Sequence, residues 1–209
     1  MNTLLSRIVH DCAPHTARGH VATYIPELAK VDPDKLGIYV SAPDGDHFAG
    51  DCAAPFTMQS VVKPLILLQA LMDSGIDTVR ALVGVEATGK PFDAINMTDQ
   101  TLLSENINPM VNMGAIAMCS LIKGDTYEER IQRVLELTRK LAGNEDIQIN
   151  QAVYLSEKRT GNKNRALGYL LKSYGMIRHV DGIKGLARGL YAHVGTHIVN
   201  AVINQCLQQ

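Results

Sequence analysis

Residues 56–75, FTMQSVVKPLILLQALMDSG, predict the helix around which the rest of the chain must fold. An apolar run fills this stretch, and its closing Gly75 suits the left-handed backbone that commonly ends a helix. Ser60 and Lys63 stand three positions apart at the head of the run, and therefore on one helix face. Pro64 disfavours helical backbone at Lys63 and lacks an amide donor, so we expect an irregular first turn.

A serine and a lysine in this arrangement can act as a nucleophile and its base. A serine hydroxyl is a weak nucleophile at its ordinary pKa, and an amine kept partly neutral by burial or nearby charge can take its proton. The free backbone N–H groups at a helix start can also stabilise a developing oxyanion. The alternative is that Ser60 and Lys63 only begin a core helix.

The same spacing occurs at Ser120 and Lys123, which shows that the spacing alone is a weak indication. This second pair lies at the C-terminal end of a predicted helix, just before Gly124. A helix C-terminus favours a charged lysine and offers no free N–H groups. Ser60 is therefore the better candidate for a nucleophile.

The remaining elements predict an α+β protein rich in helices. A hairpin is expected where two strand-like runs flank residues 43–46, since the sequence Pro-Asp-Gly there favours a tight turn. Further helices are expected at residues 3–12, 77–84, 111–122, 126–142, 147–158 and 163–174. The tail, residues 183–207, also has helical spacing of its apolar residues, although three glycines weaken it.

Composition excludes several functional classes. With 209 residues the chain can form one core, or one main domain with a lobe. Its net charge of −1 gives no general attraction to nucleic acid or to an anionic membrane. No stretch approaches the roughly 18 apolar residues that a membrane span needs. The four cysteines are far apart and predict free thiols in a reducing cytoplasm: Cys12, Cys52, Cys119 and Cys206.

Metal and nucleotide sites are not expected. His193 and His197 have the i, i+4 spacing of metal ligands, but no third ligand lies nearby, so a surface or core role on a helix is the better interpretation. Residues 84–90 match the spacing of a phosphate-binding loop, but Pro91 stands where a serine or threonine would bind magnesium. We therefore expect no cofactor and no metal.

Three polar residues are further candidates for ligand contacts. Asn112 lies in an otherwise apolar segment, where a buried amide needs hydrogen-bond partners. Glu157 and Asn164 flank a short loop between two predicted helices, and that loop could direct both side chains into one cavity. Taken singly, each of the three is better explained by a structural role, as a helix cap or a satisfied core amide.

Taken together, the motifs resemble the serine-dependent glutaminases, a family with the fold of β-lactamases and penicillin-binding proteins. The resemblance runs in continuous order over roughly residues 18–177. Five segments carry it: VATYIPELAKVDPDKLGIYV, DGDHFAGDCAAPFTMQSVVKP, VGVEATGKPFDA, NPMVNMGAIAMCSLI and YLSEKRTGNKNRALGYLLKSYG.

This resemblance implies a function for each candidate residue. Ser60 would attack the side-chain amide of L-glutamine, Lys63 would activate it, and water would release glutamate from the acyl-enzyme. Tyr24 would contact the substrate. The α-amino and α-carboxylate groups of the substrate would be held by Asn112, Glu157 and Asn164. The family also implies a homo-oligomer, a dimer or a tetramer, with no cofactor.

The likeness fades from about Arg178. Two later motifs of the family are not found: one carries a proton-transferring tyrosine, and the other is a glycine-rich strand that supplies a second oxyanion N–H. We therefore expect an incomplete β-lactamase-like domain over residues 1–177, a divergent helical tail over residues 178–209, and missing C-terminal sheet strands. Little activity is expected from such a chain. A non-catalytic glutaminase-like binding protein and a penicillin-recognising enzyme remain alternatives.

Overall fold

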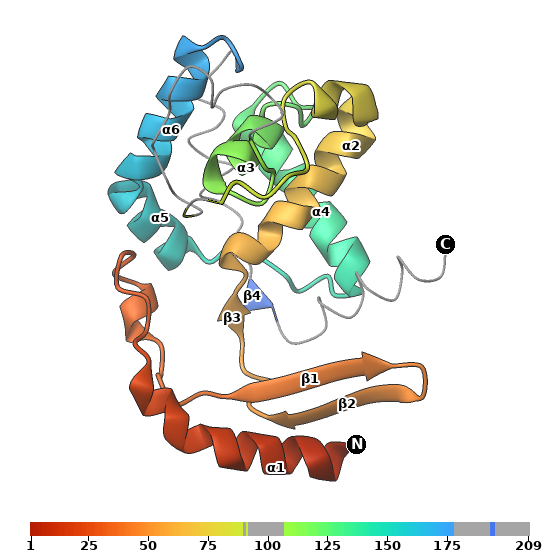
Figure 1. Cartoon of the computed structure of the whole chain (residues 1–209), viewed down its shortest axis with the longest axis vertical. Helices are drawn as coiled ribbons and strands as arrows, with labels where there is room; N and C mark the ends of the chain where they lie inside the picture. Colours follow the sequence, from red (N-terminus) through yellow and green to blue (C-terminus); the bar gives the residue numbers. More distant parts are fainter. Residues whose placement is uncertain (90, 92–106, 178–192, 195–209) are drawn as a thin grey trace.

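The computed structural model describes residues 1–89, 91, 107–177 and 193–194. A β-hairpin with helix α1 (Asn2–Cys12) along it forms one part of the molecule, and helices α2 to α6 form the other (Figure 1). The short strand β3 (Phe56–Thr57) connects the two parts. The predicted α+β composition, a hairpin plus a helical lobe, is thereby confirmed.

The hairpin consists of β1 (Gly37–Ala42) and β2 (Gly45–Gly50), which pair antiparallel. Its register runs from Gly37 opposite Gly50 to Ala42 opposite Gly45, so the turn is shorter than the predicted residues 43–46. Gly45 has φ of 121°, a backbone that only glycine adopts readily, and this lets the second strand begin two residues early. On one face of the hairpin, Tyr39 and Phe48 stack with ring centroids 6.1 Å apart.

Helix α2 (Lys63–Arg80) follows a single 3₁₀ turn, η3 (Gln59–Val62). The irregular start that Pro64 predicts is therefore present. Gly75 has φ of 77° and ψ of 164°, and it kinks the helix where the sequence predicts an end. The short helix expected at residues 77–84 is the second half of α2, and it ends earlier, at Arg80.

The core lies among α2, α3 (Asn112–Cys119), α4 (Tyr127–Ala142) and α6 (Asn162–Ser173). Every residue of α3 after its first is buried, as its apolar sequence predicts. Ile116 and Leu167 are at most 1% exposed, and burying one such side chain stabilises the fold by about 1.5–3 kcal/mol. Helix α3 contacts both α2 and α6, so its first residue is held between two other helices.

Two helices begin where side-chain caps place them. Thr126 accepts a hydrogen bond from the backbone N–H of Glu129, whose side chain reaches back to complete a capping box at the start of α4. Asn150 accepts a hydrogen bond from the N–H of Val153, so α5 (Gln151–Thr160) begins four residues later than predicted. The segment before it is anchored by Ile147, which is fully buried.

The prediction of a helical tail is wrong at the two tail residues that the structure describes. His193 and Val194 form strand β4, which pairs antiparallel with β3 so that Val194 lies opposite Phe56. Gly195, which follows at once, weakens a helix, while the backbone of β3 offers hydrogen bonds to an extended segment. The rest of the predicted tail helix, including His197 and Cys206, lies outside the described residues.

In the part of the chain that the structure describes, no helix combines the length and the apolar character that crossing a membrane requires.

Asp73 joins three parts of the helical lobe. Its side chain is 4% exposed and forms an ion pair with Arg133 of α4. It also accepts hydrogen bonds from Gln69 Nε2 at 3.1 Å and from the backbone N–H of Lys123 at 2.9 Å. Burial would raise the pKa of Asp73, but the hydrogen bonds from Arg133, Lys123 and Gln69, together with the charge of Arg133, lower this pKa.

We predict that Asp73→Asn lowers the free energy of unfolding by about 1.5–3 kcal/mol at neutral pH, because hydrogen bonds to a charged group are lost. Since folding lowers the pKa of Asp73, its contribution is complete above the unfolded value near 3.9 and is lost as the pH falls through the folded value. Denaturant unfolding of both proteins should therefore show a difference that shrinks below about pH 4.

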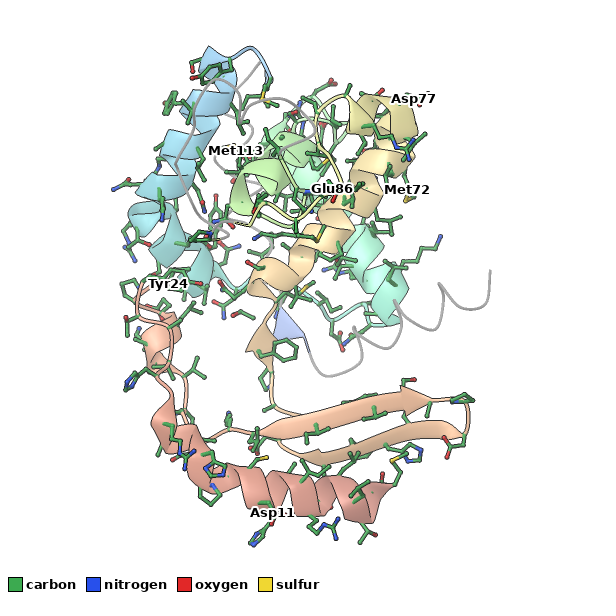
Figure 2. The ribbon with its side chains drawn as sticks, viewed as in Figure 1. Asp11, Tyr24, Met72, Asp77, Glu86 and Met113 are labelled. Atoms are coloured by element: carbon green, nitrogen blue, oxygen red, sulfur yellow. The ribbon has the colours of Figure 1, made fainter. Side chains whose placement is uncertain are left out.

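The control is Asp77→Asn, which changes an exposed aspartate on the second half of the same helix (Figure 2). This substitution should change the free energy of unfolding by less than about 0.5 kcal/mol. An equal loss in both variants would contradict the role assigned to Asp73.

Candidate functional site

Ser60 lies in the 3₁₀ turn that leads from β3 into α2, and it is exposed. The residue before it, Gln59, has φ of 47°, which is the one positive φ among the described residues other than glycine. Such a backbone costs on the order of 1–3 kcal/mol, and it is retained only where the surroundings enforce it. Here it lies at the first residue of the 3₁₀ turn, two positions after the end of β3, and Ser60 follows it directly.

Lys63 is the first residue of α2 and only 8% exposed. Its Nζ donates a hydrogen bond to Oδ1 of Asn112 at 2.8 Å. Burial lowers the pKa of Lys63 below its ordinary value. A lowered pKa increases the neutral fraction of the amine at a given pH, and only the neutral form can accept a proton from a serine.

Asn112 also bonds to a residue of a third helix, α6. It is the first residue of α3 and half-buried, and its Nδ2 donates to Oδ1 of Asn164 at 3.1 Å. One amide thus accepts from Lys63 and donates to Asn164, using both of its polar ends. The structure therefore brings three predicted site residues, from α2, α3 and α6, into one hydrogen-bonded row.

Glu157 and Tyr24 lie on a second side of the site. Glu157 of α5 is 5% exposed, whereas Tyr24 is 68% exposed. Figure 2 labels Tyr24. The Tyr24 hydroxyl donates a long hydrogen bond, 3.4 Å, to Oε1 of Gln59, the neighbour of Ser60. Partial desolvation of this hydroxyl, and then the negative charge of Glu157, raise the pKa of Tyr24. Tyr24 thus lies within electrostatic reach of Glu157 and in contact with the turn that carries Ser60.

The N-terminal segment is fixed to α5 by packing next to Tyr24. Ile25 and Leu28 are buried against Val153 of α5. The backbone N–H of Glu27 donates to Oγ of Ser156 at 3.4 Å. These contacts place Tyr24 beside the helix that carries Glu157, although 132 positions separate Tyr24 and Ser156 along the chain.

The second Ser-Lys pair has a structural role. Ser120 Oγ donates to the carbonyl oxygen of Ala117 at 2.7 Å, within the end of its own helix. Lys123 is exposed, and its backbone N–H is the donor to Asp73. The preference for Ser60 over Ser120 stays a prediction.

Two contributors were not predicted from the sequence. Gln59 supplies both the unusual backbone before Ser60 and the acceptor for Tyr24, and Ser156 holds the segment that carries Tyr24. Neither residue stands out in the sequence, because glutamine and serine are common and their partners are distant. Among the described residues, no group of three histidine, cysteine or acidic side chains could hold a metal ion.

The arrangement suits a chemical step at Ser60 on a polar molecule. It combines an exposed hydroxyl at a helix start, a buried amine of lowered pKa, a row of amides and a buried carboxylate. The amine can take a proton, the helix start can stabilise negative charge, and the carboxylate can bind a cation.

We predict that Glu157→Gln lowers the pKa of Tyr24 while leaving it above the ordinary value near 10, because the charge is removed and the desolvation remains. Titration of ring-labelled tyrosines by NMR measures this shift, and the spectrum of Tyr24→Phe assigns the signal. Glu145→Gln, at an exposed position before α5, should leave the titration unchanged. An unshifted Tyr24 in Glu157→Gln would show that the two groups are not coupled.

The chain is similar in sequence to known proteins. A family model described as Glutaminase matches residues 19–194. The chain is 46% identical over 178 residues to the glutaminase of Clostridium tetani (strain Massachusetts / E88), in an alignment that covers 85% of this chain and 58% of that protein. The chain therefore spans less than two thirds of the length of this relative.

Solved structures show the same fold. A probable glutaminase from Bacillus subtilis complexed with 6-diazo-5-oxo-L-norleucine is 31% identical and superposes with a TM-score of 0.82, covering 96% of this chain and 62% of that one. The covalent complex between the Bacillus subtilis glutaminase YbgJ and 5-oxo-L-norleucine, formed by reaction with 6-diazo-5-oxo-L-norleucine, superposes with a TM-score of 0.80 at 29% identity, covering 96% of this chain and 63% of that one. These similarities confirm the predicted β-lactamase-like α+β fold class.

Proposed function

Because the chain belongs to the glutaminase family, we propose that it hydrolyses L-glutamine to L-glutamate and ammonia through an acyl-enzyme on Ser60. The observation that carries this proposal is the environment of Lys63, whose buried Nζ donates to Asn112 one helical turn from an exposed Ser60. A related glutaminase forms a covalent complex with 5-oxo-L-norleucine, an analogue of the glutamine skeleton. That chemistry requires a nucleophile, and Ser60 is the candidate here.

Acylation begins when neutral Lys63 takes the proton of Ser60 Oγ, and the oxygen attacks the side-chain amide carbon of glutamine. The carbonyl oxygen becomes an oxyanion beside the backbone N–H of Ser60 at the helix start. When this intermediate collapses, the C–N bond breaks and the proton on Lys63 passes to the leaving nitrogen, which departs as ammonia.

Deacylation repeats these steps with water. Lys63 takes a proton from the attacking water, the ester bond to Ser60 breaks, and Oγ regains the proton as glutamate leaves. Neither half-reaction consumes a cofactor, and the lysine is neutral again at the end. Its lowered pKa supports both steps, because a fully protonated amine could accept no proton.

The remaining residues bind the amino-acid end of the substrate. Glu157 holds the α-ammonium, since a buried carboxylate gains most from a cation. Asn112 and Asn164 provide amide donors for the α-carboxylate, and Tyr24 contacts the substrate from the exposed side. We assign the protein to a reducing compartment such as the cytoplasm and expect a homo-oligomer, which light scattering would test. Among the described residues, Cys12, Cys52 and Cys119 form no disulfide, as a reducing compartment would favour.

We predict that 6-diazo-5-oxo-L-norleucine labels Ser60, because the reagent presents the same amino-acid end as glutamine. Peptide mass spectrometry should place one adduct on Ser60, and Ser60→Ala should abolish both the adduct and ammonia release from glutamine. Ser120→Ala, with the same motif spacing, is the matched control and should behave as the wild type.

Equal activity in the wild type and in Ser60→Ala would exclude Ser60 as the nucleophile. A wild type that takes up no label and releases no ammonia, yet binds glutamine in calorimetry, would make the protein a non-catalytic binding member of the family. Labelling of Ser60 by a fluorescent penicillin alone would indicate a penicillin-recognising enzyme.

A second prediction concerns pH. Since neutral Lys63 is the base, kcat/KM for ammonia release should rise with pH as the amine deprotonates, with a midpoint below the ordinary lysine pKa of 10.5. Lys63→Arg keeps a cation that cannot deprotonate at these pH values, so it should lower the rate by about 10²–10⁴. Lys123→Arg should leave the profile intact. A wild-type profile retained by Lys63→Arg would exclude Lys63 as the base.

A further inference from the structure

Asn108 joins two segments of the chain next to the site. The backbone N–H of Gly84 donates to the carbonyl oxygen of Ile107 at 2.9 Å, so these segments run together just ahead of α3. Asn108 Nδ2 then donates to the carbonyl oxygen of Glu86 at 2.9 Å and, more weakly, to that of Val85 at 3.4 Å. Figure 2 marks the first segment by Glu86 and the helix that follows the second by Met113.

The same residue also shapes the start of α3. Its Oδ1 accepts the backbone N–H of Met110 at 2.8 Å, and its carbonyl oxygen accepts the N–H of Val111 at 3.2 Å. A single side chain therefore holds the neighbouring segment through its nitrogen and its own turn through its oxygen. Among ordinary side chains of this length, only an amide supplies both a donor and an acceptor.

Helix α3 packs closely against the backbone of this turn. A Cβ atom built on Gly114 would lie 2.1 Å from the carbonyl oxygen of Asn108 and 2.9 Å from Cα of Pro109. Contacts this close are not tolerated, so the glycine lets the first turn of α3 rest directly on the backbone of Asn108. The position of that first turn therefore follows the position of Asn108.

Asn112 is the first residue of α3, and it holds Lys63 through Oδ1 and Asn164 through Nδ2. We infer that Asn108 is a positioning residue that fixes the Asn112 amide against Lys63 and Asn164, a role that rests on the proposed function of that site. Asn108 acts through Asn112 and need not touch the substrate.

The test is Asn108→Asp, which keeps the acceptor for Met110 and replaces the donor by an oxygen that repels the carbonyl groups of Glu86 and Val85. The rate constant for labelling by 6-diazo-5-oxo-L-norleucine should fall by about 10- to 100-fold, as expected when a reacting group is misplaced by up to about 1 Å. The NMR signals of the Asn112 side-chain amide, assigned by their absence in Asn112→Ala, should move.

The matched control is Asn144→Asp. Asn144 forms the same kind of turn, with its Oδ1 accepting the N–H of Asp146 at 2.9 Å, in the loop between α4 and α5. This variant should keep the wild-type labelling rate and the wild-type Asn112 signals. A purely structural effect of an added charge in a turn would appear in both variants.

A double-mutant cycle separates positioning from general destabilisation. In an Asn112→Ala background, Asn108→Asp should cause no further loss of labelling rate, because its effect passes through Asn112. Additive losses would overturn the inference, and so would a folded Asn108→Asp with unchanged Asn112 signals. If Asn108→Asp does not fold, Asn108→Ser, with its single shorter hydroxyl, takes its place under the same criteria.

The two proposals can fail separately. If the wild type takes no label, the proposed function fails, while the Asn112 signals still report whether Asn108 positions that amide. If the wild type is labelled and the Asn112 signals ignore Asn108, only the positioning role fails.

Discussion

The hydrogen bond from Lys63 Nζ to Asn112 Oδ1 is the interaction on which the site depends. A buried amine loses much of its hydration, and this loss both lowers its pKa and makes an unmet hydrogen bond costly. Asn112 accepts a hydrogen bond from this amine and donates another to Asn164. Three helices are thereby held in one relative placement, and the packing of α3 between α2 and α6 supports it. The same bond stabilises the fold and fixes the amine that we propose as the base for Ser60.

A second constraint acts on the other side of Ser60. The left-handed backbone of Gln59 turns the chain sharply between β3 and α2, and the Tyr24 hydroxyl reaches the side chain of the same residue. Tyr24 belongs to a segment that packs on α5 through Ile25 and Leu28. The turn that carries Ser60 therefore contacts the N-terminal segment as well as the helical lobe. Local strain of this kind is common where a reactive group must be presented outside a regular helix.

Much of this fold could be predicted from the sequence, and the misses have physical causes. Pro64 and Gly75 act on the backbone at their own positions, so the irregular start and the kink of α2 were predictable. The predicted start of α5 was wrong because Asn150 caps the helix. Apolar periodicity alone does not show which residue forms the cap. The tail was predicted to be helical from its spacing, but at Val194 pairing with β3 overrides that preference.

The sequence by itself determined the chemistry that is available. It placed Ser60 and Lys63 on one helical turn, and its motifs carried a family resemblance that the comparisons confirm. Only the tertiary structure decided which side chains work together. The pKa of Lys63 depends on burial by residues distant in sequence, and its partner Asn112 is 49 positions away. Such contacts arise from the packing of α2, α3 and α6, and packing brings together residues whose adjacency no local pattern encodes.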